Sequence, residues 1–326
     1  MPPTRNMQRA ARDLQRRYLK ERRDLRQDGN YEPVRCDVKL DRIIITAREV
    51  PLQAVCAIPG YRAKPPRQLW KQLYSVVNRI LGSGSIREVV VESAPAVRWL
   101  ARYRITITPR DETGLLLEDL CLILELLAQF KIVLLELALD FPIRSVVDPW
   151  FVHRHLLCGK TTMPLGPNPL HEKWGTSRSS KVARSYAKFV EILRFRIELQ
   201  LHSRFLRKHE INHASDFQKL ATILPRKHVY FASLDNRKLR EHLQRSSLPH
   251  KTKTAILRSV AESRKSLWST LRLLRRKWRF ANVCRLLSPV PEMNGIVVAA
   301  LNKWAEQWQA TSSLRDMDKT KEGEAQ

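Results

Sequence analysis

The chain has 326 residues, 43% of them hydrophobic, which is enough to bury the core of one large domain or two modest ones and excludes a wholly disordered chain. Its 59 Lys and Arg against 32 Asp and Glu give a formal net charge of +27, which favours a polyanionic partner such as DNA, RNA or an anionic membrane surface. No membrane-spanning segment is expected, because the most apolar stretch, 114–141, is interrupted by six charged residues. The basic N-terminus lacks the apolar core of a secretory signal, so the cytoplasm is the expected compartment.

The N-terminal third begins with a basic segment and continues with alternating strands and helices. Residues 5–27 repeat Arg and Lys at helical spacing, which predicts an exposed basic helix that is either a solvated leader or a DNA-contacting arm. Hydrophobic periodicity then predicts a strand at 36–46, a helix at 68–81 and a strand at 87–92.

The central part contains the clearest unit of the sequence. A strand at 103–108, a helix at 113–130 and a very apolar strand at 131–141 predict a β-α-β unit whose last strand lies inside a sheet. The elements expected after it are a short helix at 149–157, a loop at 164–169 and strands at 181–189 and 192–202.

Beyond residue 202 the sequence reads as helical and becomes more basic. Between Asn236 and Phe280 there are 14 Lys or Arg and only two acidic residues, Glu241 and Glu262. The interleaved Trp268, Trp278 and Phe280 suit either the core of a helical bundle or base stacking, and we expect at least two of the three to be core. Residues 248–254 open a possible helix-turn-helix-like pair.

These elements predict an α+β fold, with a mixed sheet and packed helices followed by a basic helical region. The expected divisions are a basic arm at 1–30, an α+β domain at 31–224, a basic helical region at 225–310 and a disordered tail at 311–326. The boundary between the two larger parts is placed near Pro225.

Two of the predicted strands carry carboxylates in apolar surroundings. On 131–141, Glu136 and Asp140 share one face, and the opposite face is wholly apolar. A buried carboxylate must be neutralised, paired with a base or used to hold a metal ion, and a salt bridge to one of the many arginines is the simplest alternative. On 192–202, Glu198 lies among Arg194 and Arg196. If the two strands are neighbours, Glu136 and Glu198 can converge on one divalent cation.

A tyrosine follows a polar and basic run that begins at Trp174. In a strand, Tyr186 and Lys188 face the same way. A phenol is a poor nucleophile at neutral pH unless a nearby cation stabilises the phenolate, and Lys188 or a bound metal can supply that charge.

Three stretches resemble the filamentous-phage gene II-type replication initiators and related phage and plasmid rolling-circle replication proteins. The segment 134–141 is similar to the family's Arg-Ile-Asp strand, Trp174–Glu191 to its Trp-x-Thr-Ser-Arg run leading to Tyr-x-Lys-x-x-Glu, and 196–207 to its Arg-Phe-Glu strand. The resemblance covers about residues 100–210. The family's aspartate is Glu136 here, its preceding arginine is a leucine, and its companion acidic residue is displaced to Glu191.

The resemblance implies a metal-dependent endonuclease that nicks one DNA strand at a replication origin in a bacterial host. Tyr186 would become joined to the 5′-phosphate and leave a 3′-hydroxyl primer, with Lys188 assisting, while Glu136, Glu198 and Asp140 would bind Mg²⁺ or Mn²⁺. Host helicase and polymerase would be further partners. The basic residues expected to contact DNA are Arg178, Lys181, Arg184, Arg194, Arg196, Arg275, Arg276 and Lys277.

Two other classes remain open. A non-catalytic DNA- or RNA-binding protein would bury Tyr186 and close Glu136 into a salt bridge, and a ribonucleoprotein scaffold would spread its basic residues evenly. His153-Arg-His155 is the nearest match to the His-hydrophobic-His metal motif of many rolling-circle nucleases, but Arg154 replaces the hydrophobic residue, so no metal is expected there. Five widely spaced cysteines indicate neither a disulfide framework nor a zinc cluster.

Overall fold

The computed structural model describes residues 35–58, 60–64, 75–82, 84–93, 103–110, 114–127, 129–142, 152–153, 155–158, 162–164, 171–176, 178–189, 193–261, 267–278, 280 and 282–323. The basic helix expected at 5–27 lies outside these ranges. Within them, no helix is both long and apolar enough to cross a membrane.

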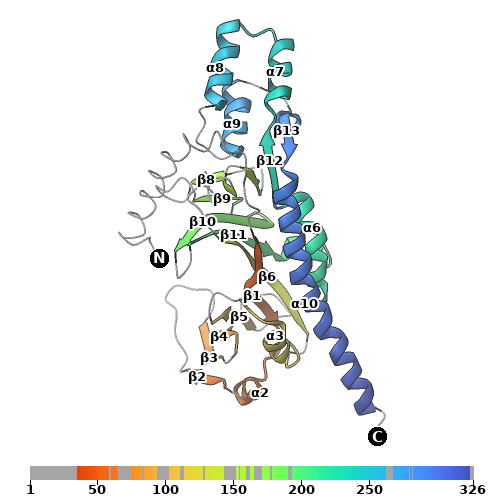
Figure 1. Ribbon diagram of the computed structural model, residues 1–326. Helices are drawn as coiled ribbons and strands as arrows, with labels where there is room; N and C mark the ends of the chain where they lie inside the picture. Colours follow the sequence, from red (N-terminus) through yellow and green to blue (C-terminus); the bar gives the residue numbers. More distant parts are fainter. Residues whose placement is uncertain are drawn as a thin grey trace.

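A ten-stranded sheet forms the centre of the molecule (Figure 1). Its strands, in spatial order, are β2 (Arg62–Lys64), β3 (Ser75–Leu81), β4 (Ile86–Ser93), β5 (Tyr103–Pro109), β1 (Asp37–Ala47), β6 (Phe130–Pro142), β11 (Leu193–His202), β10 (Lys181–Phe189), β9 (Glu172–Trp174) and β8 (Thr162–Pro164). The α+β class is confirmed, and every pairing among these strands is antiparallel, so the expected mixed sheet is in fact uniform.

The predicted β-α-β unit is present in a split form. Strands β5 and β6 both pair with β1, which runs antiparallel to each, so β5 and β6 are parallel to one another with β1 between them. The connecting helix α3 (Leu117–Leu124) is shorter than the predicted 113–130. The helix starts later than predicted because Gly114 has φ +87° and the Leu115 amide donates to the Leu40 carbonyl at 2.8 Å. After the helix, Gln129, with φ 52°, turns the chain into β6.

The helix predicted at 68–81 is wrong over its described part, because 75–81 is strand β3. The spacing of apolar residues there is compatible with a helix, but β-branched Val76 and Ile80 suit a strand, and β3 pairs with β4 along its length. Pairing with β4 therefore decides that this segment is a strand.

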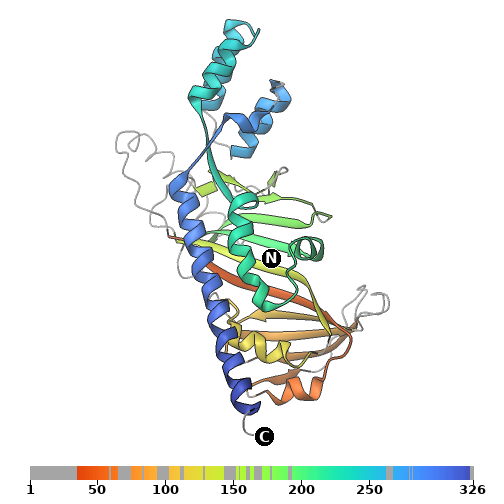
Figure 2. The ribbon, with the colours of Figure 1, turned by 90° about the vertical axis from the view of Figure 1, so that its right-hand side faces the viewer.

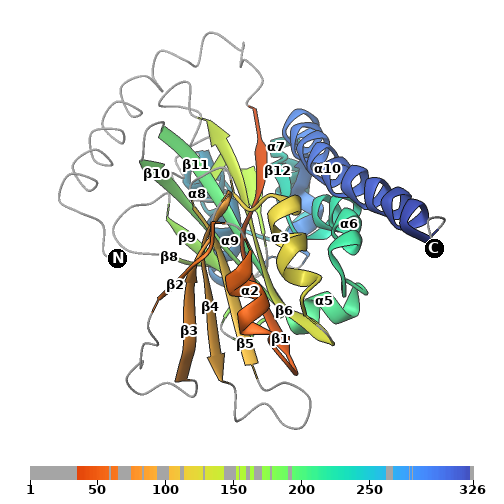
Figure 3. The same cartoon turned by 90° about the horizontal axis from the view of Figure 1, so that it is seen from below.

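Helices α3, α5 (Ser203–Lys208), α6 (Lys219–Lys227) and α10 (Pro291–Gly323) cover one face of the sheet (Figures 2 and 3). Leu135, Leu137 and Leu139 of β6 point to that face and are fully buried in a core that also contains Leu220 and Trp304. The alternation predicted for β6 is therefore confirmed, and Glu136 and Asp140 lie on the face away from these helices.

A second core lies in a lobe that projects from the end of the sheet (Figure 1). It is built from β12 (Tyr230–Leu234), α7 (Asn236–Arg245), α8 (His250–Ala261), α9 (Leu267–Lys277), the 3-10 turn η2 (Val283–Leu286) and β13 (Leu287–Pro289). Phe280 is buried in this core and Trp278 packs against it, so the core interpretation of these two aromatic residues is confirmed. The side chain of Trp268 is outside the description.

Several predicted boundaries in the C-terminal half differ from the structure. Leu156 and Leu157, expected in a short helix, form strand β7, which pairs with β12. Pro225, near which the domain boundary is predicted, lies inside α6, and the second core begins at Ala232. Residues from Thr311 to Gly323, expected as part of a disordered tail, continue α10.

Candidate functional site

A β-bulge in β1 brings one unexpected carboxylate to the polar face of the sheet. Leu40 lies opposite Leu137 and Arg42 opposite Glu136, so Asp41 is an extra residue without a partner on β6. The bulge allows both Leu40 and Ile43 to be fully buried although they are three positions apart. Bulges re-aim side chains, and this one directs Asp41 toward the polar residues of the next two strands.

Three carboxylates meet on this face. Ligand oxygens of Asp41 on β1, Glu136 on β6 and Glu198 on β11 all lie within 4.8 Å of one another. The adjacency of β6 and β11, which the sequence only allowed as an assumption, brings them together, because Glu198 lies opposite Ala138 and Gln200 opposite Glu136. Hard oxygen ligands at this spacing fit a divalent cation.

The electrostatics of the cluster favour an added positive charge. Burial raises the pKa of Glu198, and the negative charges of Glu136 and Asp41 raise it further. Burial also raises the pKa of Asp41, with Glu136 adding to the effect and Arg196 opposing it. Like charges held this close disfavour simultaneous ionisation, and a cation among them would relieve that cost.

Glu136 has two further partners in this cluster. The Arg42 guanidinium forms an ion pair with its Oε2, and the Gln200 side-chain amide donates to its Oε1 at 3.1 Å. The Arg42 side chain is 37% exposed, so it can be rehydrated if the carboxylate takes another partner. The salt bridge that the sequence left open as an alternative for Glu136 is thus present beside the carboxylate cluster.

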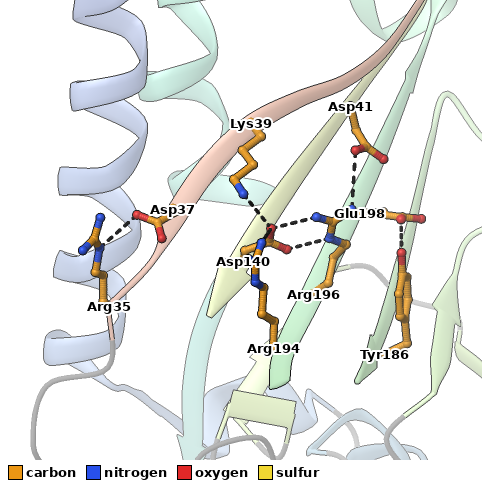
Figure 4. A network of polar contacts seen from close by, with 9 residues as sticks. All are labelled: Arg35, Asp37, Lys39, Asp41, Asp140, Tyr186, Arg194, Arg196 and Glu198. Atoms are coloured by element: carbon orange, nitrogen blue, oxygen red, sulfur yellow. Dashed lines mark hydrogen bonds and ion pairs between the residues drawn. The ribbon is translucent and has the colours of Figure 1, made fainter. Parts of the chain in front are cut away.

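Tyr186 lies on β10, next to the cluster. Its hydroxyl donates a hydrogen bond to Glu198 Oε1 (Figure 4), and its side chain is half-buried. Burial raises the pKa of the phenol, and both the charge and the hydrogen bond of Glu198 raise it further. The His171 ring meets the Tyr186 ring edge-on, with centroids 6.1 Å apart. The nucleophile predicted from sequence therefore touches a member of the acidic cluster.

Two basic residues of β10 share the face of Tyr186. Lys188 lies opposite Arg194 and Arg184 opposite Glu198 in the β10–β11 register. The positive charge of Lys188 lowers the pKa of Asp41, which opposes the effect of burial, so this lysine acts on the cluster. The prediction that Tyr186 and Lys188 face the same way is confirmed, because they lie two residues apart on β10.

Asp140, expected as a third metal ligand, is engaged differently. Its two oxygens accept hydrogen bonds from Arg196 Nε at 2.6 Å and Arg196 Nη2 at 2.7 Å, and Lys39 and Arg194 lie 3.4 and 3.5 Å away (Figure 4). Burial raises the pKa of Asp140, but the hydrogen bonds and charge of Arg196 outweigh it and leave the pKa below the usual value. Asp41 takes the third place in the acidic cluster instead.

The residues expected to contact DNA fall into two groups. Arg196 is 1% exposed and committed to Asp140, and the Lys181 ammonium donates to the carbonyls of Cys158 and His228, so both serve the fold. Arg194, too, lies against Asp140. The residues of the set that remain at the surface are Arg178 and, at the end of α9, Arg275, Arg276 and Lys277, with Arg184 half-buried.

Sequence reasoning missed Asp41. The signal that could have found it is the break in alternation between Leu40 and Ile43, where two polar residues, Asp41 and Arg42, interrupt an otherwise regular strand. His153, by contrast, is 2% exposed, and burial together with the His171 charge lowers its pKa to about 3. It packs edge-on against Phe195, which is on the core face of β11, so it lies away from the cluster.

Comparisons with known proteins are sparse. No family model and no curated protein matches the chain. Among solved structures, it is similar to one described as "Structure of Rolling Circle Replication Initiator Protein from Geobacillus stearothermophilus", with a TM-score of 0.36 and 15% sequence identity. The match covers 71% of this chain and 98% of that chain. At this TM-score and identity, the likeness assigns no role to any residue of this chain.

Proposed function

We propose that this protein is a metal-dependent tyrosine endonuclease that nicks one strand of DNA at a replication origin and starts rolling-circle replication. The observation that carries the proposal is the contact between the Tyr186 hydroxyl and Glu198, a member of the three-carboxylate cluster. A nucleophile and a candidate cation site thus adjoin on one polar face of a rigid sheet.

In the proposed reaction, the Tyr186 oxygen attacks a backbone phosphorus while the bond from that phosphorus to the 3′-oxygen breaks. The products are a 5′-phosphotyrosine and a strand with a free 3′-hydroxyl. The phenol proton can pass to Glu198 along the existing hydrogen bond, and the leaving 3′-oxygen takes up a proton from water. Lys188, on the same face, is the residue we assign to the phosphate or the developing phenolate.

Asp41, Glu136 and Glu198 are the residues that would hold Mg²⁺ or Mn²⁺. The fit rests on their oxygen donors, their mutual spacing within 4.8 Å and the burial of Glu136 and Glu198. A bound divalent ion would polarise the scissile phosphate and offset charge on the leaving oxygen. Arg42 and Gln200 would orient Glu136, as hydrogen-bonded neighbours of metal ligands commonly do.

DNA binding is assigned to basic residues outside the cluster. We propose that Arg178 and Arg184 contact the strand being cut and that Arg275, Arg276 and Lys277 on the lobe contact flanking DNA. In the lobe, α8 begins at His250, within the segment 248–254 predicted to open a helix-turn-helix-like pair, and α9 is the next helix. The partner would be the origin of a replicon in a bacterial cytoplasm, with host helicase and polymerase acting after the nick.

One observation favours a second candidate, a non-catalytic nucleic-acid-binding protein. Glu136 is ion-paired with Arg42, as that alternative expects. The same positive charge would then bind DNA without cutting it.

The test uses purified full-length protein with single-stranded and supercoiled DNA that carries the origin of its own replicon. With Mn²⁺, denaturing gels should reveal a nick and a covalent protein–DNA adduct, and EDTA should abolish both. Tyr186→Phe should lose both products and keep DNA binding. Tyr103→Phe, at another half-buried tyrosine of the sheet, is the matched control and should nick normally.

Salt-sensitive binding to the origin without any nick or adduct would favour the binding protein. A nick that survives in Tyr186→Phe would exclude Tyr186 as the nucleophile.

A further inference from the structure

Arg196 bonds both the Asp140 carboxylate and Asp41, a member of the acidic cluster. Its Nε and Nη2 bind the two oxygens of Asp140 at 2.6 and 2.7 Å, and its Nη1 lies 3.4 Å from Asp41 Oδ1 (Figure 4). The guanidinium is planar and its nitrogens are fixed in a fork, so fixing two of them on Asp140 also fixes the direction of the third.

The burial of this pair makes the arrangement rigid. Arg196 and Asp140 are each 1% exposed, whereas the Asp41 side chain is 24% exposed. A charged guanidinium cannot leave Asp140 without losing its neutralising partner inside the protein. Asp41 has no such constraint of its own, because it is the unpaired residue of a β-bulge.

We propose that Arg196, clamped by Asp140, is a positioning residue that holds Asp41 in the carboxylate cluster and thereby sets the affinity of the cluster for a divalent cation. Asp140 thus acts on the site through Arg196, and neither of the two is itself a ligand. This inference rests on the proposed function, since it gives Asp41 the role of a ligand. Lysine cannot replace Arg196 here, because one ammonium cannot present two donors to Asp140 and a third to Asp41 in the same plane.

The neighbouring Arg194 provides a matched comparison. It lies on the same strand and the same face, two residues from Arg196, and also approaches Asp140, at 3.5 Å. Its side chain is 18% exposed, against 1% for Arg196. Changing Arg194 therefore alters the charge around Asp140 while Arg196 keeps its hydrogen bonds to Asp140 and Asp41.

The experiment measures Mn²⁺ affinity of the full-length protein without DNA, by titration followed by electron paramagnetic resonance. Arg196→Lys should weaken binding by about 10-fold or more, as loss of an outer-shell partner does in other metal sites. Arg194→Lys should leave the affinity within about 2-fold of wild type, which is smaller than the 10-fold or greater loss typical for outer-shell partners. In an Asp41→Asn background, where the ligand is already removed, Arg196→Lys should have no further effect, because coupled residues are non-additive.

Should Arg196→Lys fail to fold, the double variant Arg196→Met with Asp140→Leu replaces the test. It removes both buried charges together and leaves neither unpaired, so it is expected to fold, and it should show the same loss of Mn²⁺ affinity. Circular dichroism checks the fold of each variant.

The outcomes separate the two ideas. The positioning role is overturned if Mn²⁺ binding depends on Asp41 but is unchanged in Arg196→Lys. It is also overturned if Arg196→Lys weakens Mn²⁺ binding equally with and without Asp41. In either case the proposed nuclease still stands. If the wild-type protein has no Mn²⁺ site that is lost in Asp41→Asn, both the positioning role and the proposed metal-dependent nuclease are overturned.

Discussion

Asp140→Ala should destabilise the protein by about 3–5 kcal/mol, because it removes the bidentate partner of the buried Arg196 guanidinium and leaves it only the longer contact to Asp41, at 3.4 Å. Both partners are 1% exposed, so water cannot replace the lost carboxylate without opening the structure. Lys39 and Arg194, the other two basic neighbours of Asp140, are 16% and 18% exposed and keep access to solvent. The cost therefore falls on Arg196 alone.

Urea denaturation followed by circular dichroism measures the free energy of unfolding. The matched control is Asp37→Ala, which removes the partner of Arg35 at a similar nitrogen–oxygen distance of 3.0 Å, but with side chains 66% and 36% exposed. An exposed pair of this kind contributes at most about 1 kcal/mol. If Asp140→Ala and Asp37→Ala cost the same within about 1 kcal/mol, the claim that burial makes the Asp140–Arg196 pair indispensable is refuted.

Three further outcomes are expected. Burial raises the pKa of Asp140, but Arg196 lowers it by more, so the folded-state pKa lies below the ordinary Asp value of about 3.9. The stability that this pair contributes is therefore complete above about pH 3.9 and is lost as the pH falls through the lowered pKa. Urea midpoints of the wild type should drop in that acid range, and Asp140→Asn should lack this part of the pH dependence. Gly175→Ala should cost about 1–2 kcal/mol in thermal unfolding, because Gly175 has φ +92° and a new Cβ would lie 2.8 Å from the Lys181 carbonyl, whereas an unchanged stability would show that the turn can relax. Replacing Arg275, Arg276 and Lys277 together by Ala should reduce the slope of log affinity for origin DNA against log salt by up to about 3, and an unchanged slope would remove these residues from the DNA contact.

Much of the site could be predicted because it lies on strands with clean alternation. β6 and β11 each bury one apolar face, so the positions of Glu136 and Glu198 on the opposite face followed from parity alone. Alternation along a single strand does not show which strands are neighbours in the sheet. The pairing of β6 with β11 and the insertion of β1 between β5 and β6 come from contacts across long stretches of chain.

The remaining errors have physical causes in local sequence. Ser75–Leu81 has apolar residues at spacings that fit both a helix and a strand, and pairing with β4 decides between them. Asp41 was missed because a bulge shifts the parity of β1 in its middle, so the residue does not fall on the face that simple alternation assigns to it. The sequence pattern places Asp140 and Glu136 on one face of β6, but it does not show that Asp140 is hydrogen-bonded to Arg196.

Within the lobe, the segment between Asp235 and Leu286 begins and ends at neighbouring positions. The Asp235 amide donates to the Leu286 carbonyl at 2.8 Å, its carboxylate accepts from Ser288 at 2.8 Å, and β12 and β13 run side by side beneath. Because its ends adjoin, this segment can change in length or sequence as a unit, provided that the apolar face it packs against Leu157 of β7 is kept. Under the proposed function, a lineage could exchange this segment for another and acquire a new target sequence while keeping the carboxylate cluster and Tyr186 intact. In the laboratory, the same pair of residues marks where one recognition module could be grafted in place of another.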